Sequence, residues 1–248
     1  LPDLWDVNVA DWSNDSQTTR FQPQDGFQVP YIDFVKQMTT KPVVGVGRFT
    51  SPDLMTSLIN KGVLDLIGAA RPSIADPFLP NKIREGRVEE IRECIGCNIC
   101  VSSDSLGVPI RCTQNPTMGE EWRRGWHPEK IAPKQSQDSV LVVGSGPAGL
   151  ECAMQMARRG YEVTLAEAKA EFGGRVLQES HLKGLGAWKR VMDNRLGDLR
   201  QRANVQMFTN SPVSAQDVLD LEISNVFIAT GSRWRHDGRG RSSLAPIP

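Results

Sequence analysis

The chain has 248 residues, of which 39% are hydrophobic and 23% are charged, an ordinary balance for a globular protein. Lys plus Arg equal Asp plus Glu at 29 each, so no net charge attracts the chain to nucleic acid or an anionic membrane. No apolar run reaches the roughly 18 residues of a membrane span, and the first residues show no signal-peptide pattern. The composition therefore predicts a cytoplasmic protein with neither nucleic acid nor membrane as a partner.

Residues 1–90 alternate between strand and helix signals. The apolar run 41–49 contains closely spaced glycines and predicts a buried parallel strand. Ser51 is a suitable N-cap, the next residue is proline, and Gly62 predicts the end of that helix. Residues 63–70 predict a second buried strand. This strand–helix–strand order predicts a right-handed parallel crossover.

Four of the five cysteines gather in the next segment, residues 91–137, which shows weak periodicity and predicts irregular chain held by a cofactor. The spacing is C-x2-C-x2-C, with a fourth cysteine after eleven intervening residues. A cubane cluster needs about four thiolate ligands, which this pattern supplies from two nearby stretches of chain. Zinc more often uses two separated C-x2-C pairs, and unligated thiols are the third reading. The sequence favours a [4Fe–4S] cluster on Cys94, Cys97, Cys100 and Cys112.

Residues 138–248 restart the strand–helix pattern after a polar linker at 132–138. A strand at 140–144 leads into G-x-G-x-x-G, and a helix is expected over 147–159. In that context the glycines permit a tight turn and close approach of a pyrophosphate. Glu167 ends the next strand, 18 residues after the last glycine, where it could accept hydrogen bonds from a ribose. An α/β domain without a ligand is the alternative. Further expected elements are an amphipathic helix over 185–202 and a strand over 225–231. The residues proposed to bind the nucleotide are Gly144, Ser145, Gly146, Ala148, Gly149, Glu167 and Arg175.

Two strand ends in the first block carry arginine. Gly47-Arg48 follows one predicted strand, and Ala70-Arg71 follows the next. In a β/α barrel the last two strands commonly bind phosphate at their C-terminal ends. The alternative is that both arginines are surface salt-bridge partners. Asp15, in a polar loop after the opening strand, would lie at the active end of such a barrel, although turn residues also look like this.

Three stretches carry a family resemblance. Residues 65–77 (DLIGAARPSIADP) resemble the last barrel strand of the old yellow enzyme superfamily. Residues 94–116, from CIGCNIC to RCTQNP, are similar to its iron–sulfur branch, which includes trimethylamine, dimethylamine and histamine dehydrogenases and dienoyl-CoA reductase. WRRGWHPE at 122–129 resembles the amine dehydrogenases in particular.

The resemblance implies an α/β protein with the C-terminal part of a TIM (β/α)8 barrel over 1–90, a cluster-binding segment over 91–137, and an incomplete Rossmann-like domain over 138–248. Because the chain starts without Met inside a strand-like segment, it is expected to be an internal fragment. The resemblance assigns Gly47, Arg48, Ala70 and Arg71 to an FMN phosphate and Asp15 to an active-site carboxylate.

The expected cofactors are FMN, a [4Fe–4S] cluster and ADP or FAD. The favoured function is oxidation of a small amine, with electrons passing from FMN through the cluster to an electron-transferring flavoprotein or similar soluble carrier, in a homodimer. One alternative is an enoyl or dienoyl reductase fed by NAD(P)H through FAD. A zinc-stapled nucleotide-binding module without redox activity is another.

Overall fold

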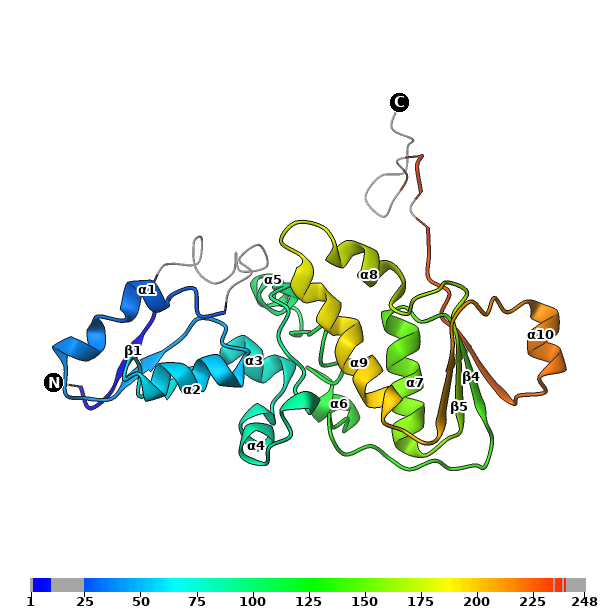
Figure 1. The fold of residues 1–248 in the computed structure, drawn as a ribbon, viewed down its shortest axis with the longest axis horizontal. Coiled ribbons are helices and arrows are strands. Elements are labelled where there is room, and N and C mark those ends of the chain that lie inside the picture. Colours follow the sequence, from blue (N-terminus) through cyan, green and yellow to red (C-terminus); the bar gives the residue numbers. More distant parts are fainter. Residues whose placement is uncertain (1, 10–24, 234, 238, 240–248) are drawn as a thin grey trace.

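The computed structural model describes residues 2–9, 25–233, 235–237 and 239, and Asp15 lies outside them. The described chain forms two α/β units with the cysteine-rich segment between them (Figure 1). Every strand pair is parallel. The α/β class predicted from the sequence is therefore confirmed. Among the described helices, none is both long and apolar enough to cross a membrane.

The first unit is built on a three-stranded sheet of order β1-β2-β3. Its helix α2 begins where the sequence predicts, because the Ser51 side chain accepts a hydrogen bond from the backbone N–H of Leu54 at 3.3 Å. Buried apolar side chains that include Phe49 and Leu64 form the core of this unit. Its elements are β1 (Trp5–Val7), α1 (Val29–Ile32), η2 (Val35–Met38), β2 (Val43–Gly45), α2 (Pro52–Asn60), β3 (Leu66–Ile67), α3 (Ala70–Ala75) and α4 (Leu79–Arg84).

The strand predicted over residues 63–70 is shorter and more exposed in the structure than expected. β3 has two residues, and Leu66 is 48% exposed. Ladder pairing ends at Gly68, whose N–H donates to the carbonyl of Gly45 at 2.8 Å. The chain then enters α3 at Ala70, so Arg71 lies on a helix that directly follows the strand.

The segment between the units is more ordered than the weak periodicity predicts. It contains η3 (Val88–Glu90), α5 (Ile99–Ser105) and α6 (Glu121–Arg124). Helices this short span two turns or fewer, so they leave no repeating apolar pattern for a sequence reading to detect. The stretch 132–138 has no regular structure, in agreement with its prediction as a linker.

A buried ionic network joins the first unit to this middle segment. The Lys82 ammonium is 2% exposed and donates to Asp76 at 2.7 Å, to the Glu90 carbonyl at 3.0 Å and to Glu129 at 3.1 Å. Asp76 is fully buried and also accepts from the backbone N–H of Arg92 at 3.0 Å. The network therefore fixes the end of the first unit to residues on both sides of the cysteines.

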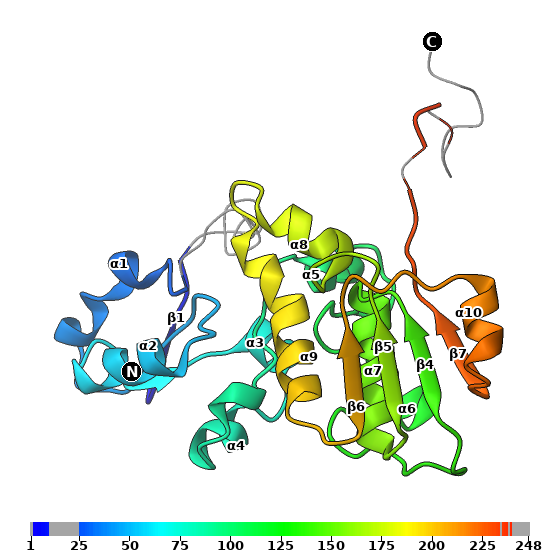
Figure 2. The ribbon, with the colours of Figure 1, turned by 45° about the vertical axis from the view of Figure 1, so that its right-hand side comes forward.

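The second unit is a four-stranded sheet of order β6-β5-β4-β7 (Figure 2). Counted within the unit, this order is 3-2-1-4, that of a Rossmann mononucleotide-binding half with its fourth strand. Helix α7 ends at Gly160, whose φ of 94° suits glycine. The elements are β4 (Val140–Val143), α7 (Pro147–Arg159), β5 (Val163–Ala166), α8 (Gly174–Ser180), η4 (Gly186–Lys189), α9 (Arg190–Arg200), β6 (Val205–Phe208), α10 (Ala215–Asp220) and β7 (Asn225–Ile228).

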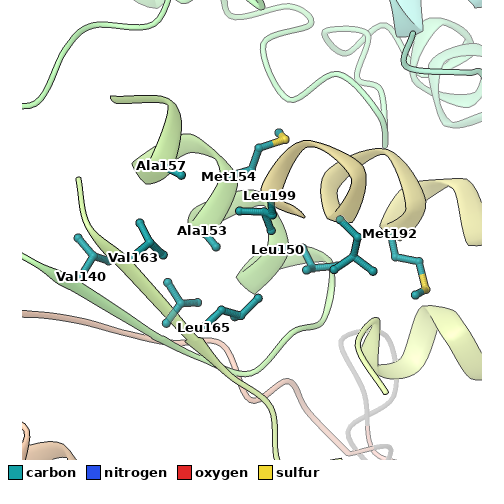
Figure 3. Packing of buried hydrophobic residues seen from close by; sticks show 11 residues of the cluster. Val140, Leu150, Ala153, Met154, Ala157, Val163, Leu165, Met192 and Leu199 are labelled. Atoms are coloured by element: carbon teal, nitrogen blue, oxygen red, sulfur yellow. The ribbon is translucent and has the colours of Figure 1, made fainter. Parts of the chain in front are cut away.

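The core of the second unit lies between its sheet and the helix pair α7 and α9. Figure 3 shows Val163 and Leu165 of the sheet facing α7 and Leu199 of α9 lying against that helix, while Met192 of α9 points toward the start of α8, where its sulfur lies beside Gly173. All four side chains are at most 7% exposed. The glycine-rich turn that opens α7 is thus anchored to a packed core. The predicted helix 185–202 is present as η4 followed by α9, whereas α8, β6 and α10 were not predicted.

Asp198 on α9 makes this unit sensitive to acid. Burial raises the pKa of Asp198, but hydrogen bonds from Arg202 and Arg158 outweigh burial and leave that pKa below its ordinary value of 3.8. A lowered folded-state pKa stabilises the fold above the unfolded-state pKa, and the contribution disappears as pH falls through the folded-state pKa. In urea titrations, Asp198→Asn should therefore lower the unfolding free energy at pH 6 and have a smaller effect at pH 3. An equal loss at both pH values would contradict this assignment.

Candidate functional site

The four clustered cysteines line a single small pocket. Cys94 and Cys97 come from the turn that leads into α5, Cys100 lies in the first turn of that helix, and Cys112 comes from the irregular stretch beyond it. Cys100 is buried and the other three are half-buried. Folding therefore brings together the four thiols that the sequence spacing singles out. The fifth cysteine, Cys152, lies on α7 away from this pocket, against the core of the second unit.

Backbone and side-chain donors approach the sulfur atoms. The N–H of Gly96 donates to Cys94 Sγ at 3.5 Å, and the N–H of Gln114 donates to Cys112 Sγ at 3.3 Å. The Thr113 hydroxyl lies 3.3 Å from Cys97 Sγ. Donors placed in this way favour sulfur in the anionic form. They suit thiolates that carry a metal group.

As free thiols, Cys94, Cys100 and Cys112 are held mostly protonated. Burial raises the pKa of Cys94 and of Cys100, and it raises the pKa of Cys112 to about 11. The nearby guanidinium of Arg71 opposes this rise at Cys94 and Cys100, and that of Arg48 does so at Cys94. A positive group bound in the pocket would supply the charge that stabilises all the thiolates.

The spacing of the thiols argues against one zinc ion. A zinc ion binds sulfur at about 2.3 Å in a tetrahedron, so its sulfur ligands lie about 3.8 Å apart. Among the described His, Cys, Asp and Glu side chains, no three converge closely enough to hold a single metal ion. The four cysteines thus fit a polynuclear group better than one ion.

Arg48 follows β2 and reaches the cysteine turn. It is 5% exposed and has φ of 54°, a left-handed conformation that bulky residues rarely adopt. Its Nη1 donates to the Cys94 carbonyl at 3.2 Å, and its Nη2 lies 3.6 Å from Asp25 Oδ1. A Cβ on the preceding Gly47 would lie 3.0 Å from Gly26 Cα, which explains glycine there. Arg48 is therefore a buried, ordered cation at the end of β2.

Arg71, on α3, also contacts the cysteine turn. It is 9% exposed, and its Nη1 donates to Asn98 Oδ1 at 2.7 Å. Asn98 sits between two of the pocket cysteines with φ of 59° and was not identified from the sequence. Ala70 is exposed beside it. The alternative of surface salt-bridge partners is wrong, because both arginines are buried against the cysteine turn.

The glycine turn of the second unit lacks side chains for two different reasons. A Cβ on Gly149 would lie 1.9 Å from the Gly144 carbonyl oxygen, so this position is closed by the protein's own backbone. A Cβ on Gly146 would meet nothing within 4 Å, and Gly146 has φ of −65°. Neither backbone conformation nor protein packing requires glycine at 146. A ligand that approaches the backbone there would require it.

The Glu167 carboxylate holds this turn in place by accepting hydrogen bonds from it. Its Oε2 accepts from the backbone N–H of Ser145 at 2.9 Å and from the Ser145 hydroxyl at 2.5 Å. Its Oε1 accepts from the N–H of Lys169 at 3.0 Å. Burial raises the pKa of Glu167, but these hydrogen bonds together lower it by more, so the pKa lies below its ordinary value. Sequence reasoning did not anticipate this role in holding the loop. Acceptance from a ribose remains a prediction.

A second backbone turn meets the glycine turn. A Cβ on Gly174 would lie 3.0 Å from Gly146 Cα, and the Ser145 hydroxyl accepts from the N–H of Gly173 at 3.2 Å. The paired glycines at 173–174 were the sequence signal for this approach. Arg175 follows on α8, half exposed, and pairs with Glu179 at 2.9 Å. Ala148 lies exposed at the start of α7.

Gln114 connects the cysteine pocket to the second unit. Its side-chain amide is 1% exposed, donates to the Glu93 carbonyl at 3.0 Å and accepts from Arg195 Nη1 at 3.1 Å. Arg195 lies on α9, is 4% exposed and donates to Glu151 of α7 at 2.7 Å. A buried polar chain therefore runs from beside Cys112 to the helix of the glycine turn. Nothing in the spacing of these residues in sequence indicated it.

A larger cleft of about 1030 Å³ opens between α9 and residues 86–93. Its charged side chains pair with one another, as Arg190 does with Glu93 at 2.5 Å and Arg158 does with Asp198 at 2.8 Å. Neither the cysteines nor the glycine turn line it. The chemistry of the described chain is therefore concentrated at the smaller cysteine pocket.

Comparison with known proteins places these features in a family. Residues 1–90 match the NADH:flavin oxidoreductase / NADH oxidase family, and residues 138–241 match the family described as pyridine nucleotide-disulphide oxidoreductase. Dimethylamine dehydrogenase from Hyphomicrobium sp. (strain x) is 48% identical over 99% of this chain and 34% of its own length.

Two solved structures are similar along the whole chain. The 6-hydroxypseudooxynicotine amine oxidase of Pseudomonas geniculata N1 is 57% identical, with a TM-score of 0.95 over 100% of this chain and 37% of its own. Histamine dehydrogenase from Rhizobium sp. 4-9 is 54% identical, with the same TM-score, over 100% of this chain and 36% of its own. The chain thus spans about a third of the length of these relatives. The resemblance expected from the sequence is confirmed, and the chain belongs to the flavin-dependent oxidoreductases of the old yellow enzyme superfamily, in the branch that includes the amine dehydrogenases.

Proposed function

We propose that this chain is the electron-relay portion of an FMN-dependent amine dehydrogenase and binds a [4Fe–4S] cluster on Cys94, Cys97, Cys100 and Cys112. The observation that carries the proposal is the convergence of these four thiols on one pocket, where the described His, Cys, Asp and Glu side chains form no group of three that could hold a single metal ion. When bound, FMN supplies two-electron chemistry at the amine, and the cluster passes those electrons on singly.

The chain's own residues support a flavin site beside this pocket. Arg48 and Arg71 are buried cations at adjacent strand ends, where β/α barrels bind phosphate. With Gly47 and Ala70 they would hold the FMN phosphate. The same two side chains hydrogen-bond to the cysteine turn. Because the same two arginines would contact both cofactor sites, they would fix the position of the flavin relative to the cluster. Residues 1–90 would then be the C-terminal part of a TIM barrel, with Asp15 as an active-site carboxylate.

The second unit would bind ADP or FAD on its glycine turn. The open space above Gly146 supports a ligand there, and Glu167 would accept from its ribose. The substrate would be a small amine, and the acceptor an electron-transferring flavoprotein or similar soluble carrier. If the bound nucleotide is a redox-active FAD that NAD(P)H reduces, the function becomes that of an enoyl or dienoyl reductase. Identification of the nucleotide released on denaturation separates these two functions.

The test of the cluster is metal analysis of the intact enzyme after anaerobic purification. We expect about four iron and four acid-labile sulfide per chain. Cys97→Ala should lose the four-iron cluster, whereas Cys152→Ala should retain it, because Cys152 lies away from the pocket. About one zinc and no sulfide would overturn the proposal in favour of a structural-metal module. Retention of the full cluster in Cys97→Ala would overturn the ligand assignment.

A further inference from the structure

The hydroxyl of Thr113 lies beside the sulfur of Cys97 on the rim of the cysteine pocket. The distance from Thr113 Oγ1 to Cys97 Sγ is 3.3 Å, within hydrogen-bond range for sulfur. Thr113 directly follows Cys112, so its position is set by the segment that closes the pocket. Cys94 and Cys112 accept backbone N–H groups instead. Backbone donors are present whatever the side chain, but the donor to Cys97 depends on the residue at position 113.

The direction of this hydrogen bond follows from the proposed ligation. In a free thiol either atom could donate. A cysteine that ligates iron is a thiolate without a proton, so its sulfur can only accept. The Thr113 hydroxyl has one proton and rotates to suit its partner. Once a cluster occupies the pocket, Thr113 must be the donor and Cys97 the acceptor.

A donor to a ligating sulfur affects the two redox states unequally. Reduction adds one electron, and thus one negative charge, to the cluster and its thiolates. Because a hydrogen bond to a more negative acceptor is stronger, the donor stabilises the reduced state more than the oxidised state. Hydrogen bonds to the sulfurs are accordingly one of the factors that set the potential of such clusters. The electron comes from the reduced flavin and leaves to the acceptor, while the Thr113 proton stays on its oxygen.

We propose that Thr113 raises the reduction potential of the cluster by donating its hydroxyl hydrogen bond to Cys97. This inference rests on the proposed function, since it requires a cluster on the four cysteines. It assigns Thr113 a tuning role: the residue is not a ligand, and it acts through Cys97. Thr113 is exposed, so its methyl group contributes little to packing, and the hydroxyl is the part of the side chain with a defined contact.

The test is a potentiometric titration of the cluster in the intact enzyme, followed by EPR spectroscopy, for wild type, Thr113→Val and Thr113→Ser. Valine has the shape of threonine without the hydroxyl. One hydrogen bond to a charged acceptor alters an equilibrium by about tenfold. Because the bond is present in both redox states, only the difference in its strength moves the midpoint, so Thr113→Val should shift the midpoint more negative by up to about 59 mV, the one-electron equivalent of tenfold. Thr113→Ser keeps the hydroxyl and should titrate like wild type.

The outcomes are distinguishable. Equal midpoints for wild type and Thr113→Val, with full iron and sulfide in both, would overturn the role of Thr113 and leave the proposed function intact. Equal shifts in Thr113→Val and Thr113→Ser would also overturn it, because the hydroxyl would not be the cause. Absence of iron and sulfide from the wild type would overturn both. Should Thr113→Val assemble no cluster, Thr113→Ala supplies the same comparison without the branched side chain.

Discussion

Gly149→Ala should abolish nucleotide binding and destabilise the second unit, because the added Cβ would lie 1.9 Å from the Gly144 carbonyl oxygen. In a helix this substitution would ordinarily gain up to about 1 kcal/mol in propensity. Here the clash is with backbone at the turn itself, and overpacking of this kind costs about 1–3 kcal/mol or more. The clash should therefore outweigh the propensity gain. Urea unfolding and calorimetric titration with ADP measure the two effects.

Gly146→Ala is the matched control for this prediction. Its Cβ would meet no protein atom within 4 Å, and its φ of −65° suits alanine, so the unfolding free energy should stay close to wild type. The Cβ would project into the space above the turn, so ADP affinity should still fall. If Gly146→Ala bound ADP as wild type does, the proposed nucleotide site would be wrong. If Gly149→Ala were as stable as wild type, the packing argument would be wrong.

Lys82→Met should be the most destabilising change in the first unit. The substitution leaves Asp76 fully buried without its ammonium partner at 2.7 Å, although the N–H of Arg92 still donates to it. Removing one member of a buried ion pair costs about 3–5 kcal/mol, since the remaining charge stays in a poorly solvated site. Methionine retains most of the apolar length of lysine, so the loss reports on charge rather than on volume. Chemical denaturation at neutral pH provides the measurement.

Lys41→Met provides the exposed counterpart. Lys41 pairs with Asp3 at 3.3 Å, and their side chains are 46% and 99% exposed. Solvent screens such a pair, so its removal should leave the unfolding free energy nearly unchanged. Equal losses in the two variants would show that burial does not govern the Lys82 pair. A double variant, Lys82→Met with Asp76→Asn, should recover part of the loss, because it removes the uncompensated charge.

The sequence predicted the elements whose ends carry distinct chemical signals. Helices α2 and α7 begin and end where Ser51, Gly62 and Gly160 indicate, because caps and left-handed glycines act locally. It missed α8, β6 and α10. α8 and α10 are two turns or fewer, and α8 starts at a glycine pair that resembles a loop. β3 was overestimated, because an apolar run does not reveal where ladder pairing stops.

The residues of the candidate site also divide into those that the sequence could identify and those that only the structure reveals. The four cysteines and the glycine turn are encoded by spacing along the chain, so they could be identified without a structure. Asn98, Gln114 and Arg195 could not, because their roles depend on contacts between segments distant in sequence. Gln114 and Arg195, for example, are 81 positions apart. Glu167 was selected as an acceptor for a ribose, which stays a prediction, and its bonds to Ser145 become visible only in the folded loop.

The polar stretch 132–138 looks like a boundary between two independent halves of the chain. However, side-chain hydrogen bonds join the cysteine segment, on one side of this stretch, to both units. Gln114 reaches Arg195 in the second unit, and Asn115 donates to the Ile74 carbonyl of the first at 3.1 Å. These two neighbouring residues hold the cysteine segment to both units. A nucleotide unit excised at residue 138 would lose a buried partner of Arg195. The segment is thus held to both units by side-chain hydrogen bonds as well as by the chain at its two ends. In the proposed function, these bonds would fix the position of the cysteine pocket between the two units.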